Sequence, residues 1–373
     1  MKNENRENRN ATVIAVIIAL LIGAGGMYAA LYFGLPITTS TVINKSEKEV
    51  TITDTGIADA VEKLYDSVVV VLVYSDGKSV ASGTGFVYKK TDSKAYILTN
   101  NHVVNTNGKT TVKVKFTDER EEEVKVEGTD VYTDLAVLSL SSNKVESVAS
   151  IGSSEKMRLG DTVFTIGAPL DTEYSWSITR GVLSGKDRMV EVSLSTSPSS
   201  QSDYVMKVLQ TDASINSGNS GGPLANANGE VIGITNMKLV SNGIEGMGFA
   251  IPIDDAIEYA ETIISGETIK RPKLGVNMIN LADTWTLYQN RISVNTELTS
   301  GVVVAKVENN SPASVAGLQK GDIIIALGDN KIQNFAQLRY NLFKHKVGDT
   351  VTITYERDGK NEKAKVVLNA TLD

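Results

Sequence analysis

Short runs of apolar and β-branched residues recur through the middle of the chain, separated by Gly, Asn, Asp and Ser. Examples are SVVVVLVYS, AYILTNNHVV, DLAVLSL and EVIGITNMKLV. Roughly a dozen such runs at near-regular spacing are typical of β-barrels or a β-sandwich. We therefore predict a mainly β domain over residues 57–268, which begins with a short amphipathic helix and closes with the helix IPIDDAIEYAETIISG.

The composition changes near residue 270, at the segment ETIKRPK. Beyond it, strand candidates such as GVVVAKV and TVTITYERDG are interrupted by helix candidates. Asn334 is placed to cap one of these helices, with Gln337 three residues later. Strands mixed with helices in this way predict a separate α+β module over residues 270–371.

The longest apolar run lies near the N-terminus. No charged residue occurs from Asn10 to Asn44, and about 25 apolar or small residues in this stretch exceed the roughly 20 that a helix needs to cross a bilayer. We predict a transmembrane anchor over residues 11–35. A cleaved signal peptide is the alternative, although its apolar region is usually only about 7–15 residues long.

The charges around this run predict its orientation. Lys2, Arg6 and Arg9 precede it, and the next basic residue comes well after it. The positive-inside rule then places residues 1–10 in the cytoplasm and the later domains outside the cell membrane. Residues 36–56 are polar and rich in Thr and Ser, and we interpret them as a tether.

Composition restricts the chemistry that these domains can carry. The chain has no cysteine, which excludes disulfides, thiol nucleophiles and cysteine-based metal sites. It has only two histidines, His102 and His345, so we expect no metal centre and no cofactor. The net charge is −7 with both signs interspersed, which offers nucleic acid no basic surface.

The segment ASINSGNSGGPLAN, residues 213–226, is too rich in glycine for an ordinary strand. Glycine adopts backbone conformations closed to other residues, and a turn over Gly218–Gly222 would hold Ser220 at its tip. A serine nucleophile needs a base and backbone donors for the developing oxyanion. We expect the amides of Gly218 and Ser220 to be those donors, with Asn219 between them completing the oxyanion hole.

The base must come from one of the two histidines. His102 follows the strand AYILTNN in the β domain, whereas His345 lies among lysines in the other module and is interpreted as a solvated residue. Asp134 precedes a buried strand, where a carboxylate needs a partner. Each residue alone has an ordinary explanation as a turn, strand end or cap. Together, His102, Asp134 and Ser220 predict a Ser–His–Asp site for acyl transfer.

These motifs resemble the HtrA (DegP-like) family of trypsin-fold serine endopeptidases. ILTNNHVV, TDLAVL and TDASINSGNSGGPL match its His, Asp and Ser motifs in order, and GTGFV, GVLSG and GMGFAIP match further blocks. The resemblance covers residues 57–370. It implies a chymotrypsin-like or trypsin-like fold of two six-stranded β-barrels, with the active site in the cleft between them.

The C-terminal block SPASVAGLQKGDIIIALGD resembles the family's PDZ domain. A PDZ groove binds the C-terminus of a peptide as an added strand. By this resemblance, its carboxylate-binding loop comprises Lys273, Leu274, Gly275 and Val276.

The family also implies a homotrimer that cleaves unfolded, misfolded or exported proteins after small aliphatic residues, for quality control and stress tolerance at the cell surface. Ile215 falls where the family lines its specificity pocket, and Thr235 and Met237 are candidates for contacting extended substrate. The short segment KKTDSK replaces the long loop of cage-forming relatives and favours a simple trimer. The alternative is a surface chaperone or peptide-binding protein with an idle catalytic site.

Two positions depart from related sequences. Ser217 stands where many relatives have proline, which predicts a more mobile oxyanion loop. Asn219 stands where digestive trypsins have an aspartate that pairs with a newly cut N-terminus. Activation by that ion pair cannot operate here, and we expect substrate to shift a population of loop states instead.

Overall fold

The computed structural model describes most of the chain in two compact units, residues 1–53 and 54–373. The residues described are 4–32, 56–104, 110–168, 175–192, 204–239, 246–294 and 296–372.

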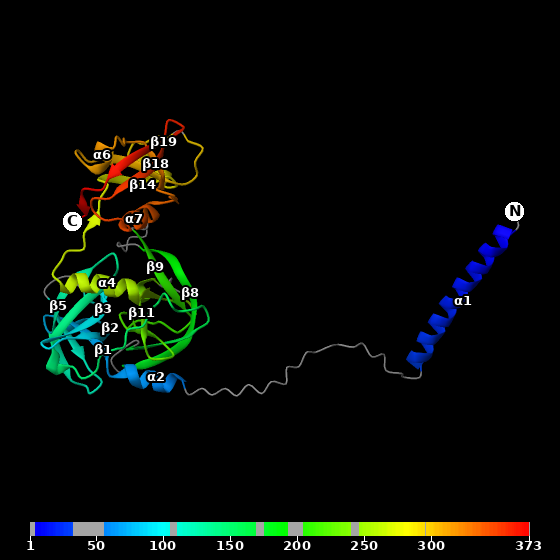
Figure 1. Cartoon of the computed structure of the whole chain (residues 1–373), viewed down its shortest axis with the longest axis horizontal. Coiled ribbons are helices and arrows are strands. Elements are labelled where there is room, and N and C mark those ends of the chain that lie inside the picture. Colours follow the sequence, from blue (N-terminus) through cyan, green and yellow to red (C-terminus); the bar gives the residue numbers. More distant parts are fainter. Residues whose placement is uncertain are drawn as a thin grey trace. The chain divides into compact units, whose positions relative to one another are not determined.

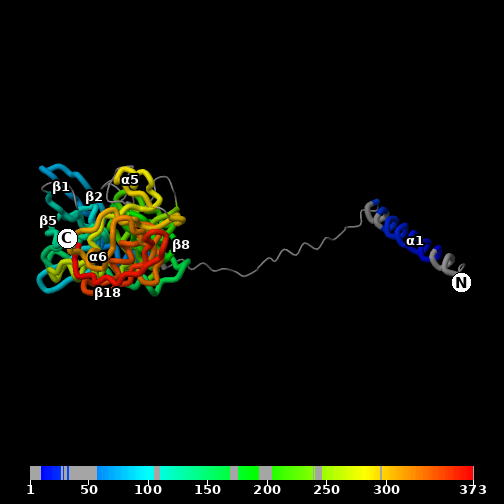
Figure 2. Tube along the Cα trace, turned by 90° about the horizontal axis from the view of Figure 1, so that it is seen from above, coloured from blue at the N-terminus to red at the C-terminus, as the bar shows by residue number. Residues whose placement is uncertain are grey.

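Among its described residues, the first unit has one helix, α1 (Glu4–Tyr32) (Figures 1 and 2). Its described apolar side chains are exposed, among them Leu20, Leu21 and Ile22. In the part of the chain that the structure describes, no helix combines the length and the apolar character that a membrane crossing requires. The anchor predicted over residues 11–35 is therefore not confirmed, and nearly all of the predicted tether over residues 36–56 lies outside the described residues.

The first six strands of the second unit close into a barrel in the order β1-β2-β3-β6-β5-β4. Strand β1 is an unbroken apolar run because both of its faces are buried. Val69 and Val71 belong to the core of this barrel. Val70 and Leu72 pack on the opposite face against Ala168 of the next barrel. The strands are β1 (Val68–Ser75), β2 (Lys78–Lys90), β3 (Lys94–Asn100), β4 (Thr111–Lys115), β5 (Glu121–Asp130) and β6 (Leu135–Ser141).

The next six strands form a second closed barrel in the order β10-β11-β12-β9-β8-β7. One large apolar cluster includes side chains from both barrels and from α2 (Gly56–Tyr65) and α4 (Ile253–Ile264). The predicted pair of six-stranded barrels is confirmed. The strands are β7 (Thr162–Gly167), β8 (Ser177–Val192), β9 (Tyr204–Thr211), β10 (Pro223–Asn226), β11 (Val231–Thr235) and β12 (Gly248–Pro252).

The C-terminal module is an antiparallel sheet with helices, as the α+β pattern predicts. The expected cap of α7 (Phe335–Phe343) is confirmed, because the Asn334 side chain accepts a hydrogen bond from the Gln337 amide at 2.9 Å. This helix lies against β9 of the second barrel (Figure 1). The strands are β13 (Arg271–Pro272), β14 (Val276–Asn280), β15 (Val302–Val307), β16 (Ile323–Leu327), β17 (Asn330–Lys331), β18 (Thr350–Arg357), β19 (Lys360–Val367) and β20 (Thr371–Leu372). The helices are α5 (Thr284–Gln289), α6 (Pro312–Val315) and α7 (Phe335–Phe343).

Candidate active site

His102 and Ser220, far apart in the sequence, line one cleft between the two barrels. His102 lies on α3 (Asn101–Val104), the single turn of helix that directly follows β3. Ser220 lies in the turn that precedes β10. The cleft is lined by Ala81, Ser82, His102, Val103, Ser217, Gly218, Ser220 and Met237.

Asp134 holds His102 through two contacts, one to the imidazole and one to the backbone. The Asp134 Oδ2 atom lies 2.6 Å from His102 Nδ1, and Oδ1 accepts a hydrogen bond from the His102 backbone amide at 2.9 Å. The Asp134 side chain is 1% exposed, whereas that of His102 is 28% exposed. A carboxylate on Nδ1 leaves Nε2 as the nitrogen that can exchange a proton with a substrate or nucleophile.

The backbone of Asp134 is held in an uncommon conformation. Its φ of +54° lies in the left-handed region, which a residue other than glycine adopts only when its surroundings fix it there. The Asp134 carbonyl accepts hydrogen bonds from the Asn101 amide at 2.9 Å and from Asn100 Nδ2 at 3.0 Å. From the second barrel, Asn236 Nδ2 donates to Asp134 Oδ2 at 2.8 Å. The carboxylate is therefore fixed from both barrels.

Threonine side chains fix the carbonyl groups of the Ser220 turn. Thr84 Oγ1 donates to the Gly218 carbonyl at 2.6 Å, and the Thr84 amide donates to the Ser220 carbonyl at 2.9 Å. Thr235 Oγ1 donates to the Asn219 carbonyl at 2.5 Å. The amide of a trans peptide points away from its carbonyl. Holding the Asn219 carbonyl on Thr235 therefore turns the Ser220 amide the other way.

Among the described residues, some backbone amides of this turn donate a hydrogen bond, and others, here called open, have no acceptor. The Asn219 amide donates to the Asn216 carbonyl at 3.0 Å. Within the described residues, the amides of Gly218 and Ser220 have no acceptor. These two amides are the pair expected to stabilise an oxyanion, whereas Asn219 contributes to the turn and its amide is already used.

The two glycines after Ser220 are required by close packing. Gly221 has a φ of +84°, and a Cβ atom there would lie 2.2 Å from the Thr84 carbonyl oxygen and 2.3 Å from Thr99 Oγ1. A Cβ on Gly222 would lie 2.8 Å from the Ile166 carbonyl oxygen. A larger residue at Gly221 would push the turn away from the first barrel, and one at Gly222 would push it away from β7 of the second barrel, so that either change would displace Ser220.

Ser220 Oγ accepts a hydrogen bond from the Met237 amide at 3.1 Å. No hydrogen bond joins Ser220 Oγ to His102 in the described part of the structure. Such bonds are often long or misaligned in ligand-free enzymes and tighten when substrate binds. Met237, expected to contact substrate, thus contacts the Ser220 hydroxyl through its backbone amide and also lines the cleft.

The other two residues expected to contact substrate, Ile215 and Thr235, have different surroundings. Ile215 is 8% exposed and packs against β12, where a Cβ on Gly248 would lie 2.5 Å from Ile215 Cγ1. The Thr235 side chain is fully buried, and its hydroxyl is engaged by the carbonyls of Asn219 and Gly222. Its expected contact with substrate is therefore corrected: Thr235 supports the nucleophile turn from beneath.

The predicted carboxylate-binding loop, Lys273 to Val276, lines a groove between β14 and α7. Gly275 has a φ of +74°, and a Cβ there would lie 2.3 Å from Ser311 Cβ. The Gly275 carbonyl accepts from the Glu308 amide at 2.9 Å, and Lys273 Nζ pairs with Glu308 at 2.9 Å. The far wall of the groove includes Phe335, Leu338 and Leu342.

Four residues support the site but were missed by the sequence analysis or given another role there. They are Thr84, Asn100, Asn236 and Thr235. The signal for Thr84 was its place in GTGFV, and the signal for Asn100 was the polar pair that interrupts the strand before His102. Neither motif indicates a partner. The contacts of Thr84 and Asn236 join residues that are more than one hundred positions apart in sequence.

Comparison with known proteins places both folded domains. Residues 83–234 match the trypsin-like peptidase domain family, and residues 272–368 match the PDZ domain family. The serine protease Do-like HtrA of Bacillus subtilis (strain 168) is 42% identical over 79% of this chain, and the match spans 65% of that relative's length. The serine protease Do-like HtrB of the same strain is 37% identical, over 99% of this chain and 84% of the relative.

Solved structures agree with this match. The serine endoprotease from Yersinia pestis is 28% identical, with a TM-score of 0.62 over 86% of this chain and 99% of that one. The HtrA-type protease AlgW with a decapeptide is 26% identical, with a TM-score of 0.61 over 83% of this chain and 97% of that one.

Proposed function

Because the chain belongs to the HtrA family of serine proteases, with a trypsin-like peptidase domain and one PDZ domain, we propose that His102, Asp134 and Ser220 are its catalytic residues. The chain is a serine endopeptidase rather than a binding protein with an idle site. One observation supports the residue assignment most strongly. An Asp134-bound imidazole and a serine flanked by two open amides line the same cleft.

In the proposed reaction, Ser220 Oγ attacks the carbonyl carbon of the scissile peptide bond while His102 Nε2 removes the hydroxyl proton. Asp134 stabilises the resulting imidazolium. The amides of Gly218 and Ser220 stabilise the oxyanion of the tetrahedral intermediate. His102 then gives its proton to the leaving amine, and the C–N bond breaks. Water, activated by the same imidazole, hydrolyses the acyl-enzyme and regenerates Ser220.

The proposed substrates are unfolded or misfolded polypeptides. Ile215, which packs against Gly248, would line the specificity pocket, and the proposed cleavage is after small aliphatic residues. The groove between β14 and α7 would bind a peptide C-terminus as an added strand. The AlgW structures with a decapeptide and with a tripeptide support peptide binding in a relative of similar fold.

The proposal also places the protease outside the cytoplasm, attached through residues 11–35 and assembled as a homotrimer. The uncharged N-terminal run and the basic residues before it support the attachment. Alkaline extraction of membranes should leave the full chain in the pellet and release a variant that lacks residues 1–55. Analytical ultracentrifugation of that variant should give a mass three times that of one chain.

Ser220→Ala tests the assignment of the nucleophile. The variant should lose degradation of dye-labelled casein, because alanine has no hydroxyl group to attack the peptide carbonyl. Ser141→Ala, at the exposed end of β6, is the matched control and should retain full activity. Degradation by folded Ser220→Ala protein at the wild-type rate would refute the assignment.

A further inference from the structure

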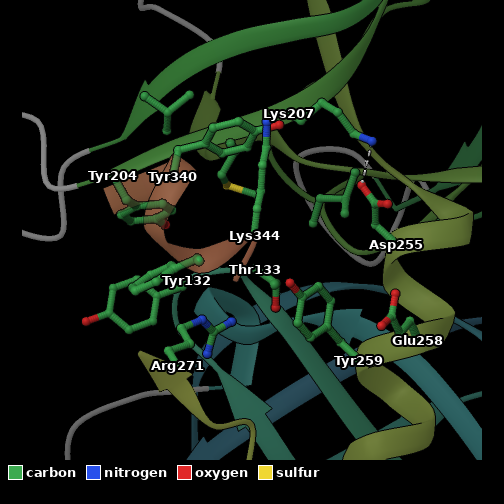
Figure 3. Close-up of a pocket in the computed structure, with 14 residues that line it drawn as sticks. Tyr132, Thr133, Tyr204, Lys207, Asp255, Glu258, Tyr259, Arg271, Tyr340 and Lys344 are labelled. Atoms are coloured by element: carbon green, nitrogen blue, oxygen red, sulfur yellow. Dashed lines mark ion pairs between the residues drawn. The ribbon is translucent and has the colours of Figure 1, made fainter. Parts of the chain in front are cut away.

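The linker between the protease and PDZ domains contains a buried arginine, Arg271, which begins β13. Its guanidinium lies 5.0 Å from the ring centroid of Tyr132, 5.6 Å from that of Tyr259 and 5.3 Å from that of Phe343. Figure 3 shows it beside Tyr132 and Tyr259 at the edge of a pocket. Three aromatic rings thus surround a cation that belongs to neither barrel.

Arg271 forms a two-point ion pair with Asp130 of the first barrel. The two guanidinium nitrogens lie 2.7 and 2.8 Å from the two carboxylate oxygens. Both side chains are 8% exposed. Removing one partner of such a pair leaves an uncompensated buried charge, so Asp130 depends on Arg271.

Asp130 in turn holds the connection between β5 and β6. It pairs with Leu135 across the hairpin, so that four residues, 131–134, form the connection. Asp130 Oδ2 accepts hydrogen bonds from the Thr133 amide at 2.8 Å and from the Thr133 hydroxyl at 2.5 Å. The Tyr204 hydroxyl also donates to the Val131 carbonyl at 3.2 Å.

The last residue of this connection is Asp134, whose left-handed backbone must be stabilised by its surroundings. We propose that Arg271 is a positioning residue for the proteolytic reaction: by holding Asp130, it fixes the turn from which Asp134 orients His102. This inference rests on the proposed function, because it assumes that Asp134 and His102 act with Ser220.

A purely structural role of Arg271 would change the kinetic constants of its variants in a different way. If Arg271 only joined the two domains, its loss would lower stability or weaken substrate capture, and any loss of rate would not depend on Asp134. If it acts through Asp134, its loss lowers kcat, and this effect disappears once the Asp134 carboxylate is absent.

The test uses Arg271→Gln in the full chain, with a fluorogenic peptide substrate. We expect kcat to fall about 10- to 100-fold, the effect of a small displacement of a catalytic group, while KM changes by less than about twofold. Arg271→Lys should give an intermediate kcat, because lysine keeps the charge but not the two-point geometry. The matched control, Arg357→Gln, removes the similar pair with Asp322 within the PDZ domain and should leave kcat unchanged.

The decisive arm is a double-mutant cycle with Asp134→Asn. Arg271→Gln should cause no further loss of kcat in that background. Wild-type kcat in folded Arg271→Gln protein, or an equal loss in both backgrounds, would overturn the proposal. If circular dichroism shows that Arg271→Gln does not fold, Asp130→Asn replaces it in the same cycle, with the same expected and overturning results.

The Ser220→Ala variant and the double-mutant cycle together distinguish a failure of the proposed function from a failure of the role proposed for Arg271. Should Ser220→Ala retain activity, the catalytic assignment is wrong whatever Arg271 does. If Ser220→Ala is inactive but the cycle is additive, only the role of Arg271 is wrong.

Discussion

The two sides of the active-site cleft differ in how completely their polar groups are bonded. On the His102 side, Asp134 accepts hydrogen bonds at both carboxylate oxygens and at its carbonyl. On the Ser220 side, the turn carbonyls are fixed, but the amides of Gly218 and Ser220 have no acceptor among the described residues. His102, the proposed base, is therefore oriented in advance, and the open amides are the proposed donors to the transition state.

Each side nevertheless depends on the opposite barrel. Thr84 of the first barrel holds the carbonyls of Gly218 and Ser220, which belong to the nucleophile turn. Asn236 of the second barrel holds the carboxylate of Asp134. Neither side would keep its geometry if the barrels separated, so the cleft is a property of the pair.

Removal of His102, the proposed base, should cause the largest loss of kcat. His102→Ala leaves the nucleophile turn intact but removes the proton acceptor. We expect kcat to fall by about 10⁶-fold, as for loss of either central residue of a serine protease triad. Steady-state hydrolysis of a fluorogenic peptide measures this loss, and His345→Ala is the matched control, which should be fully active.

Asp134→Asn should have the second largest effect. Asparagine fits the same space and can still bond Asn236, but it favours the wrong tautomer of His102. We expect kcat to fall by about 10⁴-fold with little change in KM. A decrease of less than tenfold would show that the closely bonded His102 side contributes little to the rate.

Thr84→Val tests the nucleophile side alone. Valine keeps the shape and the backbone amide but removes the hydroxyl that holds the Gly218 carbonyl. We expect kcat to fall about 10- to 100-fold because the turn that carries Ser220 loses one of its anchors to the first barrel. Thr165→Val is the matched control, since the buried Thr165 hydroxyl has no hydrogen-bond partner in the described structure. Equal kcat values for the two variants would contradict a role for the Thr84 hydroxyl.

The smallest predicted effect is on the stability of the first barrel at acidic pH. Hydrogen bonds from Lys125 and Lys94 lower the pKa of Glu127 from 4.5 to about 2. Because the folded-state pKa lies below the ordinary value, these contacts stabilise the fold above pH 4.5, and this contribution is lost as pH falls through about 2. Glu127→Gln should therefore cost about 1 kcal/mol at pH 7 and almost nothing at pH 2.

Thermal unfolding at both pH values measures the Glu127 effect. Glu123→Gln, on the same strand, is the matched control and should melt like the wild type at each pH. A Glu127→Gln protein that is equally destabilised at pH 7 and pH 2 would contradict the contribution of the ion pairs.

Local pattern was enough to predict the strands, the cap of α7 and the residues with a chemical signature. His102, Asp134 and Ser220 each stand beside an apolar run or a glycine pair, so their types and neighbours mark them. The structure brings His102 and Asp134 into contact and places Ser220 in the same cleft. The shape of the Ser220 turn depends on Thr84 and Thr235, whose partners, the carbonyls of Gly218 and Asn219, lie in the turn and not on the strands of the threonines.

The same limit explains the errors. Thr235 was a candidate for substrate contact through the family resemblance, but neither the resemblance nor the strand pattern shows which hydroxyl meets which carbonyl. Arg271 was visible only as part of a basic linker, ETIKRPK. Its partner Asp130 is 141 positions away, and no local rule could pair them.

The most direct test of the central claim is the site and rate of labelling by a fluorophosphonate probe, measured by mass spectrometry of the digested protein. The account predicts one label, on Ser220, formed rapidly in the wild type and only slowly in His102→Ala. Labelling at another residue, or equally fast labelling of Ser220 without His102, would contradict it.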